Sequence, residues 1–261
     1  MKITHCIFDM DGLLLDTERI YYEVTSEILG RYGKTYTWEL RSLSLGLRQY
    51  DSADLLVRET GIPMSVEELM KERNEKNIER FPNARPMPGV MRLIKHLKAH
   101  NIPIAVATSS SRDNFAVKSL NNQELFSMFD SITCGDDPDV KNGKPAPDLF
   151  LSAWKSMGSP PLDQCLVFED AINGIQAAKN AGMHVVWVPD PNIALLHPEY
   201  IQPSSTAFNL SSTPFSRPTK RSDLPVLIVN TGGAPFALAN GPMASLKGAV
   251  VSHLQSYTNF L

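Results

Sequence analysis

Four carboxylates are the residues of this 261-residue sequence with the clearest chemical potential. Asp9 and Asp11 directly follow one short apolar run, and Glu169 and Asp170 directly follow another. Two ionised carboxylates about 4 Å apart repel each other by roughly 4 kcal/mol at an effective dielectric constant near 20. If the four carboxylates lie close together in the fold, a bound proton or cation must therefore offset this repulsion. Oxygen ligands without histidine or cysteine favour Mg²⁺, which keeps several waters and bridges to phosphate. The carboxylates therefore predict a magnesium site.

Hydroxyl groups and one lysine supply the complementary chemistry. Thr108, Ser109 and Ser110 follow a further apolar run, and Lys144 lies in the segment GKPAPD. The Thr108 hydroxyl, the backbone amides at the start of the next helix and the Lys144 ammonium group together suit an anion. A magnesium site beside such a pocket indicates phosphoryl transfer.

The apolar runs themselves predict how these groups meet. Runs at residues 3–8, 102–107, 131–134, 165–168 and 185–188 alternate with helical stretches. This alternation indicates an α/β fold with a Rossmann-like parallel sheet buried on both faces. Right-handed crossovers bring the carboxyl ends of such strands to one edge, where open α/β sheets bind their ligands. We therefore expect the four polar groups to share one crevice.

Two regions depart from this alternation. Residues 16–84 contain helical patterns and no convincing strand. The first pattern repeats every four residues at Ile20, Val24, Ile28 and Tyr32, and two more stretches follow at 51–59 and 65–81. We expect them to be an all-helical insert in a core made of residues 1–15 and 85–200. Residues 201–261 form an atypical tail, and the serine, threonine and proline content of 202–222 favours disorder. The tail pattern also allows a short strand over 224–229 and a short helix over 243–254.

Composition excludes several classes of protein. The chain is 43% hydrophobic and carries a formal net charge of -3, so it offers no basic face for nucleic acid. It has no apolar run of the roughly 20 residues that span a membrane, and its amino terminus does not read as a signal peptide. Its cysteines are too few and too widely spaced for a disulfide framework: Cys6, Cys134 and Cys165. We expect a cytoplasmic monomer with buried free thiols and no nucleic-acid or membrane partner.

Four segments together resemble the haloacid dehalogenase (HAD) superfamily of phosphatases. They stand in this sequence, in order, as FDMDG, ATSS, GKPAPDLF and VFEDA, and the resemblance covers about residues 1–190. Longer segments such as FDMDGLLLDTE and NGKPAPDLFL resemble the eukaryotic branch that contains pseudouridine-5'-phosphatases and glycerol-3-phosphatases. The helical insert matches the cap domain of this family, which excludes water and contacts the leaving group.

The resemblance implies specific roles for the site residues. Asp9 is the nucleophile that becomes an aspartyl phosphate, and Asp11 is the acid for the leaving alcohol and then the base for water. Thr108 binds the phosphoryl oxygens, and Lys144 offsets negative charge. Mg²⁺ is held by Asp9, the Asp11 backbone carbonyl and Asp170, with Glu169 as an outer-shell ligand. Residues expected beside the substrate are Gly12, Ser109 and Ser110.

We therefore expect a Mg²⁺-dependent phosphatase that hydrolyses a small phosphomonoester through an aspartyl-phosphate intermediate. Pseudouridine 5'-phosphate, glycerol 3-phosphate and a sugar phosphate are the candidate substrates. A second acid at position 11 favours phosphate esters over carbon–halogen bonds. Two alternatives stay open: a hexose phosphomutase that uses the same residues, and a noncatalytic regulator that retains the fold.

Overall fold

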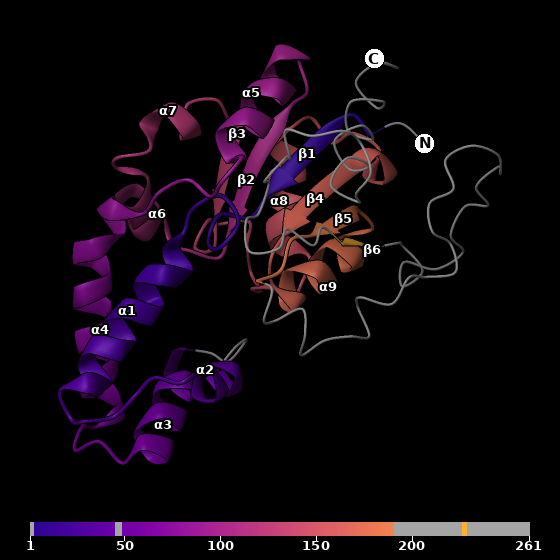
Figure 1. Cartoon of the computed structure of the whole chain (residues 1–261). Helices are drawn as coiled ribbons and strands as arrows, with labels where there is room; N and C mark the ends of the chain where they lie inside the picture. Colours follow the sequence, from indigo (N-terminus) through magenta and orange to yellow (C-terminus); the bar gives the residue numbers. More distant parts are fainter. Residues whose placement is uncertain (1–2, 45–48, 191–225, 229–261) are drawn as a thin grey trace, which may run out of the picture.

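A parallel sheet forms the centre of the computed structural model, which describes residues 3–44, 49–190 and 226–228. Its six strands have the order β3-β2-β1-β4-β5-β6 (Figure 1). Their bounds are β1 His5–Phe8, β2 Ile104–Thr108, β3 Ser131–Cys134, β4 Cys165–Glu169, β5 His184–Trp187 and β6 Val226–Ile228. The expected α/β fold with a parallel sheet is confirmed. β6 lies within the stretch predicted as a short strand, whereas the predicted disorder over 202–222 and the helix over 243–254 lie outside the described residues.

The sheet is buried on both faces, which explains why its strands are continuous apolar runs. In β1, Phe8 belongs to one hydrophobic cluster and Ile7 to the other. α5 (Val90–Ala99), with Ile94, packs into the first cluster, whereas α8 (Asp148–Ser156) and α9 (Ile172–Ala181) pack into the second. Helices therefore cover both faces and leave the carboxyl ends of the strands available for polar residues.

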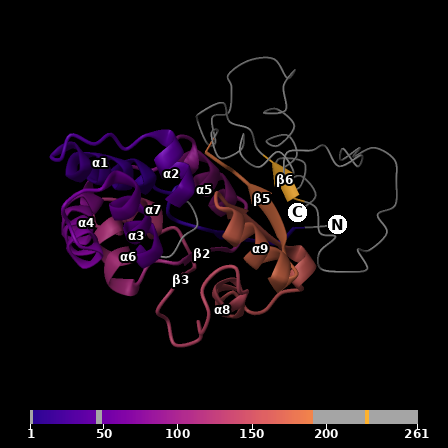
Figure 2. The ribbon, with the colours of Figure 1, turned by 90° about the horizontal axis from the view of Figure 1, so that it is seen from below.

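The helices between β1 and α5 lie together at one end of the sheet (Figures 1 and 2). Between β1 and α5 lie α1 (Thr17–Gly30), α2 (Trp38–Ser44), α3 (Gln49–Thr60), α4 (Val66–Arg80) and the short 3₁₀ helix η1 (Phe81–Asn83). α4 begins with a capping box, in which Ser65 and Glu68 exchange side-chain and backbone hydrogen bonds. α6 (Arg112–Ser119) and α7 (Gln123–Phe126) follow β2.

The two connections between these helices and the sheet run side by side. The Asp16 amide donates to the Arg85 carbonyl oxygen at 2.9 Å, and the Met87 amide donates to the Leu14 carbonyl oxygen at 2.9 Å. The helical segment thus leaves and re-enters the sheet region at one place, next to the carboxyl end of β1. None of the helices in the described part of the chain combines the length and the hydropathy of a membrane-spanning segment.

Candidate active site

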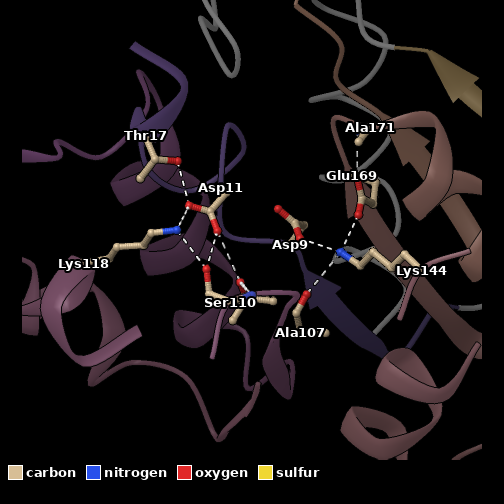
Figure 3. A network of polar contacts seen from close by, with 10 residues as sticks. Asp9, Asp11, Thr17, Ala107, Ser110, Lys118, Lys144, Glu169 and Ala171 are labelled. Atoms are coloured by element: carbon tan, nitrogen blue, oxygen red, sulfur yellow. Dashed lines mark hydrogen bonds and ion pairs between the residues drawn. The ribbon is translucent and has the colours of Figure 1, made fainter. Parts of the chain in front are cut away.

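Three neighbouring central strands carry the site. β1 pairs with β2 on one side and with β4 on the other, in parallel. Asp9 follows β1, Thr108 ends β2 and Glu169 ends β4. Because parallel strands present their carboxyl ends at one edge, residues far apart in the sequence lie close together there (Figure 3).

Lys144 joins the first two carboxylates of this edge. Its Nζ lies 2.5 Å from Asp9 Oδ1 and 2.6 Å from Glu169 Oε1, and it also donates to the Ala107 carbonyl oxygen at 3.4 Å (Figure 3). The side chains are 7% exposed for Lys144, 9% for Asp9 and 1% for Glu169. The second oxygen of Glu169 accepts a 2.8 Å hydrogen bond from the Ala171 amide. Glu169 is therefore held at both carboxylate oxygens.

Burial changes the ionisation of this cluster. It raises the pKa of Asp9 to about 7, an effect that Lys144 opposes and that Glu169 and Asp11 reinforce. Burial alone would lower the pKa of Lys144, but Asp9 and Glu169 raise it above its ordinary value. Lys144 is therefore a permanent cation beside a carboxylate whose charge is poorly stabilised without further positive charge.

Asp11 is turned away from Lys144 and makes its own set of contacts. Its Oδ1 accepts hydrogen bonds from Thr17 at 2.7 Å and from the Lys118 ammonium at 2.6 Å. Its Oδ2 accepts from Ser110 at 2.9 Å and from Thr108 at 3.4 Å. Burial would raise the pKa of Asp11, but Lys118 and these hydrogen bonds together lower it. The negative charge of the Asp11 carboxylate is thus stabilised by an ion pair and by hydrogen bonds.

Asp170 packs against the turn that follows Asp9. Gly12 has φ 77°, and a Cβ added there would lie 2.4 Å from Asp170 Oδ2, so this turn needs a residue without a side chain. Burial raises the pKa of Asp170 well above its ordinary value, and the charges of Glu169 and Asp9 raise it further. In the part of the chain that the structure describes, no three acidic, histidine or cysteine side chains form a ready-made metal cage.

The structure brings most of the sequence-predicted residues to one edge, and the two serines that follow Thr108 differ in exposure. Ser109 is exposed, and its backbone packs against Gly135, where a Cβ would lie 2.5 Å from the Ser109 carbonyl oxygen. Ser110 instead faces inward, where its amide donates to the Thr108 hydroxyl at 3.1 Å. Lys118, which contacts Asp11, is absent from the sequence-based set. The expectation of buried free thiols holds for all three cysteines.

Comparison with known proteins identifies the family of this chain. The family model of the haloacid dehalogenase-like hydrolases matches residues 6–188. The chain belongs to this family. It is 47% identical over 200 residues to (DL)-glycerol-3-phosphatase 2 of Arabidopsis thaliana, covering 75% of this chain and 83% of the relative. It is 48% identical over 195 residues to the "Probable pseudouridine-5'-phosphatase" of Drosophila melanogaster, covering 74% of this chain and 84% of the relative.

Solved structures agree with this assignment. A haloacid dehalogenase-like protein from Agrobacterium tumefaciens matches with a TM-score of 0.63 at 26% identity, covering 71% of this chain and 82% of that one. A β-phosphoglucomutase from Clostridium difficile shares the fold, with a TM-score of 0.61 at 22% identity over 99% of this chain and 98% of that one. The expected membership of the HAD superfamily and the expected enzyme class, a phosphoric monoester hydrolase, are both confirmed.

Proposed function

We propose that this HAD hydrolase is a Mg²⁺-dependent phosphatase that cleaves a small phosphomonoester through an aspartyl phosphate on Asp9. The observation that carries the proposal is the pairing of the buried Asp9 carboxylate with Lys144 at 2.5 Å, at the edge where Asp11 also lies. A carboxylate can attack phosphorus once the mutual repulsion of two anions has been reduced. Lys144 supplies a positive charge for that purpose.

The reaction proposed for these residues has two steps. In the first, one Asp9 oxygen forms a bond to phosphorus, the ester P–O bond breaks, and the leaving alkoxide takes a proton from Asp11. In the second, Asp11 takes a proton from water, the water oxygen attacks the aspartyl phosphate, and Asp9 and phosphate are released. A bound phosphate dianion places negative charge near Asp11 and so favours the protonated carboxyl needed at the start.

The donor set fits a hard divalent cation. Asp9 is buried and Asp170 is half-buried, and the pKa of each carboxyl is raised. The charge of Asp9 contributes to the raised pKa of Asp170, and a bound cation relieves such repulsion. We propose that Asp9, Asp170 and the Asp11 backbone carbonyl hold Mg²⁺ directly. Glu169 is already bound at both oxygens, by Lys144 and by the Ala171 amide, and this favours an outer role for it. Mg²⁺ would supply neutralisation and alignment of the phosphoryl oxygens.

The substrate is proposed from the relatives. Two of them are named for glycerol 3-phosphate and pseudouridine 5'-phosphate, both small polar phosphomonoesters. We propose a substrate of this class for the present chain, with Thr108 and Ser110 beside the phosphoryl group and Gly12 in the turn against it. We also propose that residues 16–84 act as the cap over a core of residues 1–15 and 85–200, and that the enzyme works as a cytoplasmic monomer. One relative, (DL)-glycerol-3-phosphatase 1 of Arabidopsis thaliana, is named as mitochondrial, and recovery of the present protein in a mitochondrial fraction would contradict the cytoplasmic proposal.

A phosphate-release assay tests the proposal. With 4-nitrophenyl phosphate and Mg²⁺, Asp9→Asn is expected to lose at least about 10³-fold in activity, because covalent catalysis and charge stabilisation fail together. Chelation of divalent cations should abolish release by the parent, and added Mg²⁺ should restore it. Asp139→Asn is the matched control, since Asp139 is 64% exposed and its ion-pair partner at 3.7 Å is Lys155, which has no role in the proposed reaction.

Other outcomes identify the alternatives. Activity of Asp9→Asn equal to that of the parent contradicts the proposed nucleophile. A screen with hexose phosphates that yields an isomerised sugar phosphate and little free phosphate indicates a phosphomutase. Absence of turnover across nucleotide, sugar and polyol monophosphates, in parent and variants alike, indicates a noncatalytic protein.

A further inference from the structure

Lys118 of α6 is a buried cation that the proposed reaction does not use. Its side chain is 1% exposed, and its Nζ donates to Asp11 Oδ1 at 2.6 Å, Ser110 Oγ at 2.8 Å and the Tyr21 hydroxyl at 3.1 Å. An ammonium group has three N–H donors and no acceptor. All three donors of Lys118 thus have an acceptor, and one of these is the proposed acid–base residue.

The surroundings of Lys118 come from both parts of the molecule. Its ammonium lies 4.5 Å from the centroid of the Phe81 ring and 5.4 Å from that of Tyr21. Tyr21 belongs to α1 and Phe81 to η1, the first and last elements of the helical insert. Ser110 and Lys118 itself follow β2 in the sheet region. The ammonium therefore contacts the insert at both of its ends and the sheet region at once.

Two lysines pair with different carboxylates of the site: Lys144 with Asp9 and Glu169, and Lys118 with Asp11. Figure 3 shows Lys144 approaching Asp9 from one side and Lys118 approaching Asp11 from the other. Thr17, the first residue of α1, completes the hold on Asp11 Oδ1 at 2.7 Å. Oδ1 of Asp11 is thus held by one residue of the insert and by a lysine that contacts the insert, whereas Oδ2 accepts from Ser110 and Thr108.

We propose that Lys118 is a positioning residue for Asp11: it fixes the direction of the Asp11 carboxyl and makes that direction depend on the seating of the helical insert against the sheet region. This inference rests on the proposed function, in which Asp11 protonates the leaving group. A buried ammonium costs several kcal/mol unless it is well paired, so a lysine here must either serve Asp11 or only stabilise the fold. These two roles differ in one measurable respect.

Leaving groups separate positioning from stability. The 4-nitrophenolate ion is a stable anion and departs without a proton, whereas the alkoxide of benzyl phosphate needs one. The ratio kcat/KM reports the steps up to departure of the leaving group. A residue that positions the acid therefore matters for benzyl phosphate and much less for 4-nitrophenyl phosphate, while loss of folded protein affects both equally.

The test compares Lys118→Met with the parent on both esters in the presence of Mg²⁺. General acid–base catalysis is typically worth 10²- to 10⁴-fold, so we expect kcat/KM for benzyl phosphate to fall by about 10- to 100-fold and that for 4-nitrophenyl phosphate by less than about 3-fold. Lys98→Met is the matched control: it removes a lysine that pairs with Asp130 at 2.7 Å on the surface, and it should change neither value.

A second variant keeps the test decisive if Lys118→Met does not fold. Tyr21→Phe removes one acceptor from Lys118 but keeps the ring, and it should lower the benzyl value relative to the nitrophenyl value in the same direction by about 3-fold. Equal losses on both esters, or no loss on either, in a folded variant would overturn the inference. Failure of the proposed function looks different, because the parent would then turn over neither ester or Asp9→Asn would remain active.

Discussion

Gly174 of α9 packs against the Glu169 carboxyl, so that Gly174→Ala tests the geometry of the site by adding a single carbon atom. A Cβ at this position would lie 1.8 Å from Glu169 Oε1 and 1.9 Å from Glu169 Cδ. Nonbonded atoms cannot approach so closely, so the Glu169 carboxyl would have to move. Glu169 is 1% exposed, so its carboxyl has no access to solvent in place. It would have to leave Lys144 at 2.6 Å and the Ala171 amide at 2.8 Å.

The size of the effect follows from those lost contacts. Breaking a buried ion pair typically costs about 3–5 kcal/mol, whereas glycine to alanine in an unobstructed helix stabilises by up to about 1 kcal/mol. The free energy of unfolding of Gly174→Ala should therefore be about 2–4 kcal/mol below that of the parent. Phosphate release should fall as well, because Lys144 loses one of the two carboxylates that hold it beside Asp9.

Urea unfolding followed by circular dichroism measures the stability, and the phosphate-release assay measures the activity. Gly30→Ala is the control, because Gly30 lies in α1 and an added Cβ meets nothing within 4 Å. It should be neutral or stabilise by up to about 1 kcal/mol. If Gly174→Ala proves as stable and as active as Gly30→Ala, the packing argument is refuted.

Three further changes are expected to have measurable effects. Lys144→Met should abolish phosphate release and lower the free energy of unfolding by about 3–5 kcal/mol, since it leaves Asp9 and Glu169 as unpaired neighbours; unchanged urea unfolding would contradict this. Gly12→Ala should lower activity and stability together, because φ 77° strains alanine and its Cβ would lie 2.4 Å from Asp170 Oδ2; a parent-like melting temperature and rate would argue against it. Without metal, the folded chain keeps a proton on Asp9 up to about pH 7 whereas the unfolded chain loses it near 3.8, so the contribution of Asp9 to stability falls as the pH rises through this window. Asp9→Asn should remove that fall in urea unfolding across the window, and an identical pH dependence in both proteins would show the reasoning to be wrong.

The strands were predictable because burial on both faces requires unbroken apolar sequence. β3 was expected over residues 131–134 and occupies Ser131–Cys134, and β2 was expected over 102–107 and occupies Ile104–Thr108. The shift in β2 arises because Ile102 is buried but lies before the strand begins. An apolar residue indicates burial, whereas a strand begins only where its backbone pairs with the backbone of the neighbouring strand.

The helices of the insert were predictable only where they bury an apolar face. α1, α3 and α4 have buried residues and were expected, whereas none of the residues of α2 (Trp38–Ser44) is buried. A short helix without a buried face leaves no periodic signal in the sequence. Its existence depends on contacts with its neighbours, which a single sequence does not display.

Lys118 was not predictable from its local sequence. It follows Phe115, Ala116 and Val117 in a helix of ordinary composition, and nothing there distinguishes it from a lysine that points to solvent. Its partner Asp11 lies 107 residues away, and Tyr21 lies 97 residues away. The acids and Lys144 could be recognised because strand ends gather them, but a lysine in the body of a helix acquires its role only through tertiary packing.

The strand order places the proposed reacting residues at the central strands of the sheet, away from the edge strand β6. β1, which leads into Asp9, has paired neighbours on both sides, and β5 stands between β4 and β6. The family model matches residues 6–188, so the edge strand Val226–Ile228 lies beyond the matched residues. A change in this outer segment would alter an edge strand that β4 and β5 separate from β1, the strand that precedes the nucleophile. Variation at the carboxyl terminus can thus accumulate while the reacting groups keep their spacing.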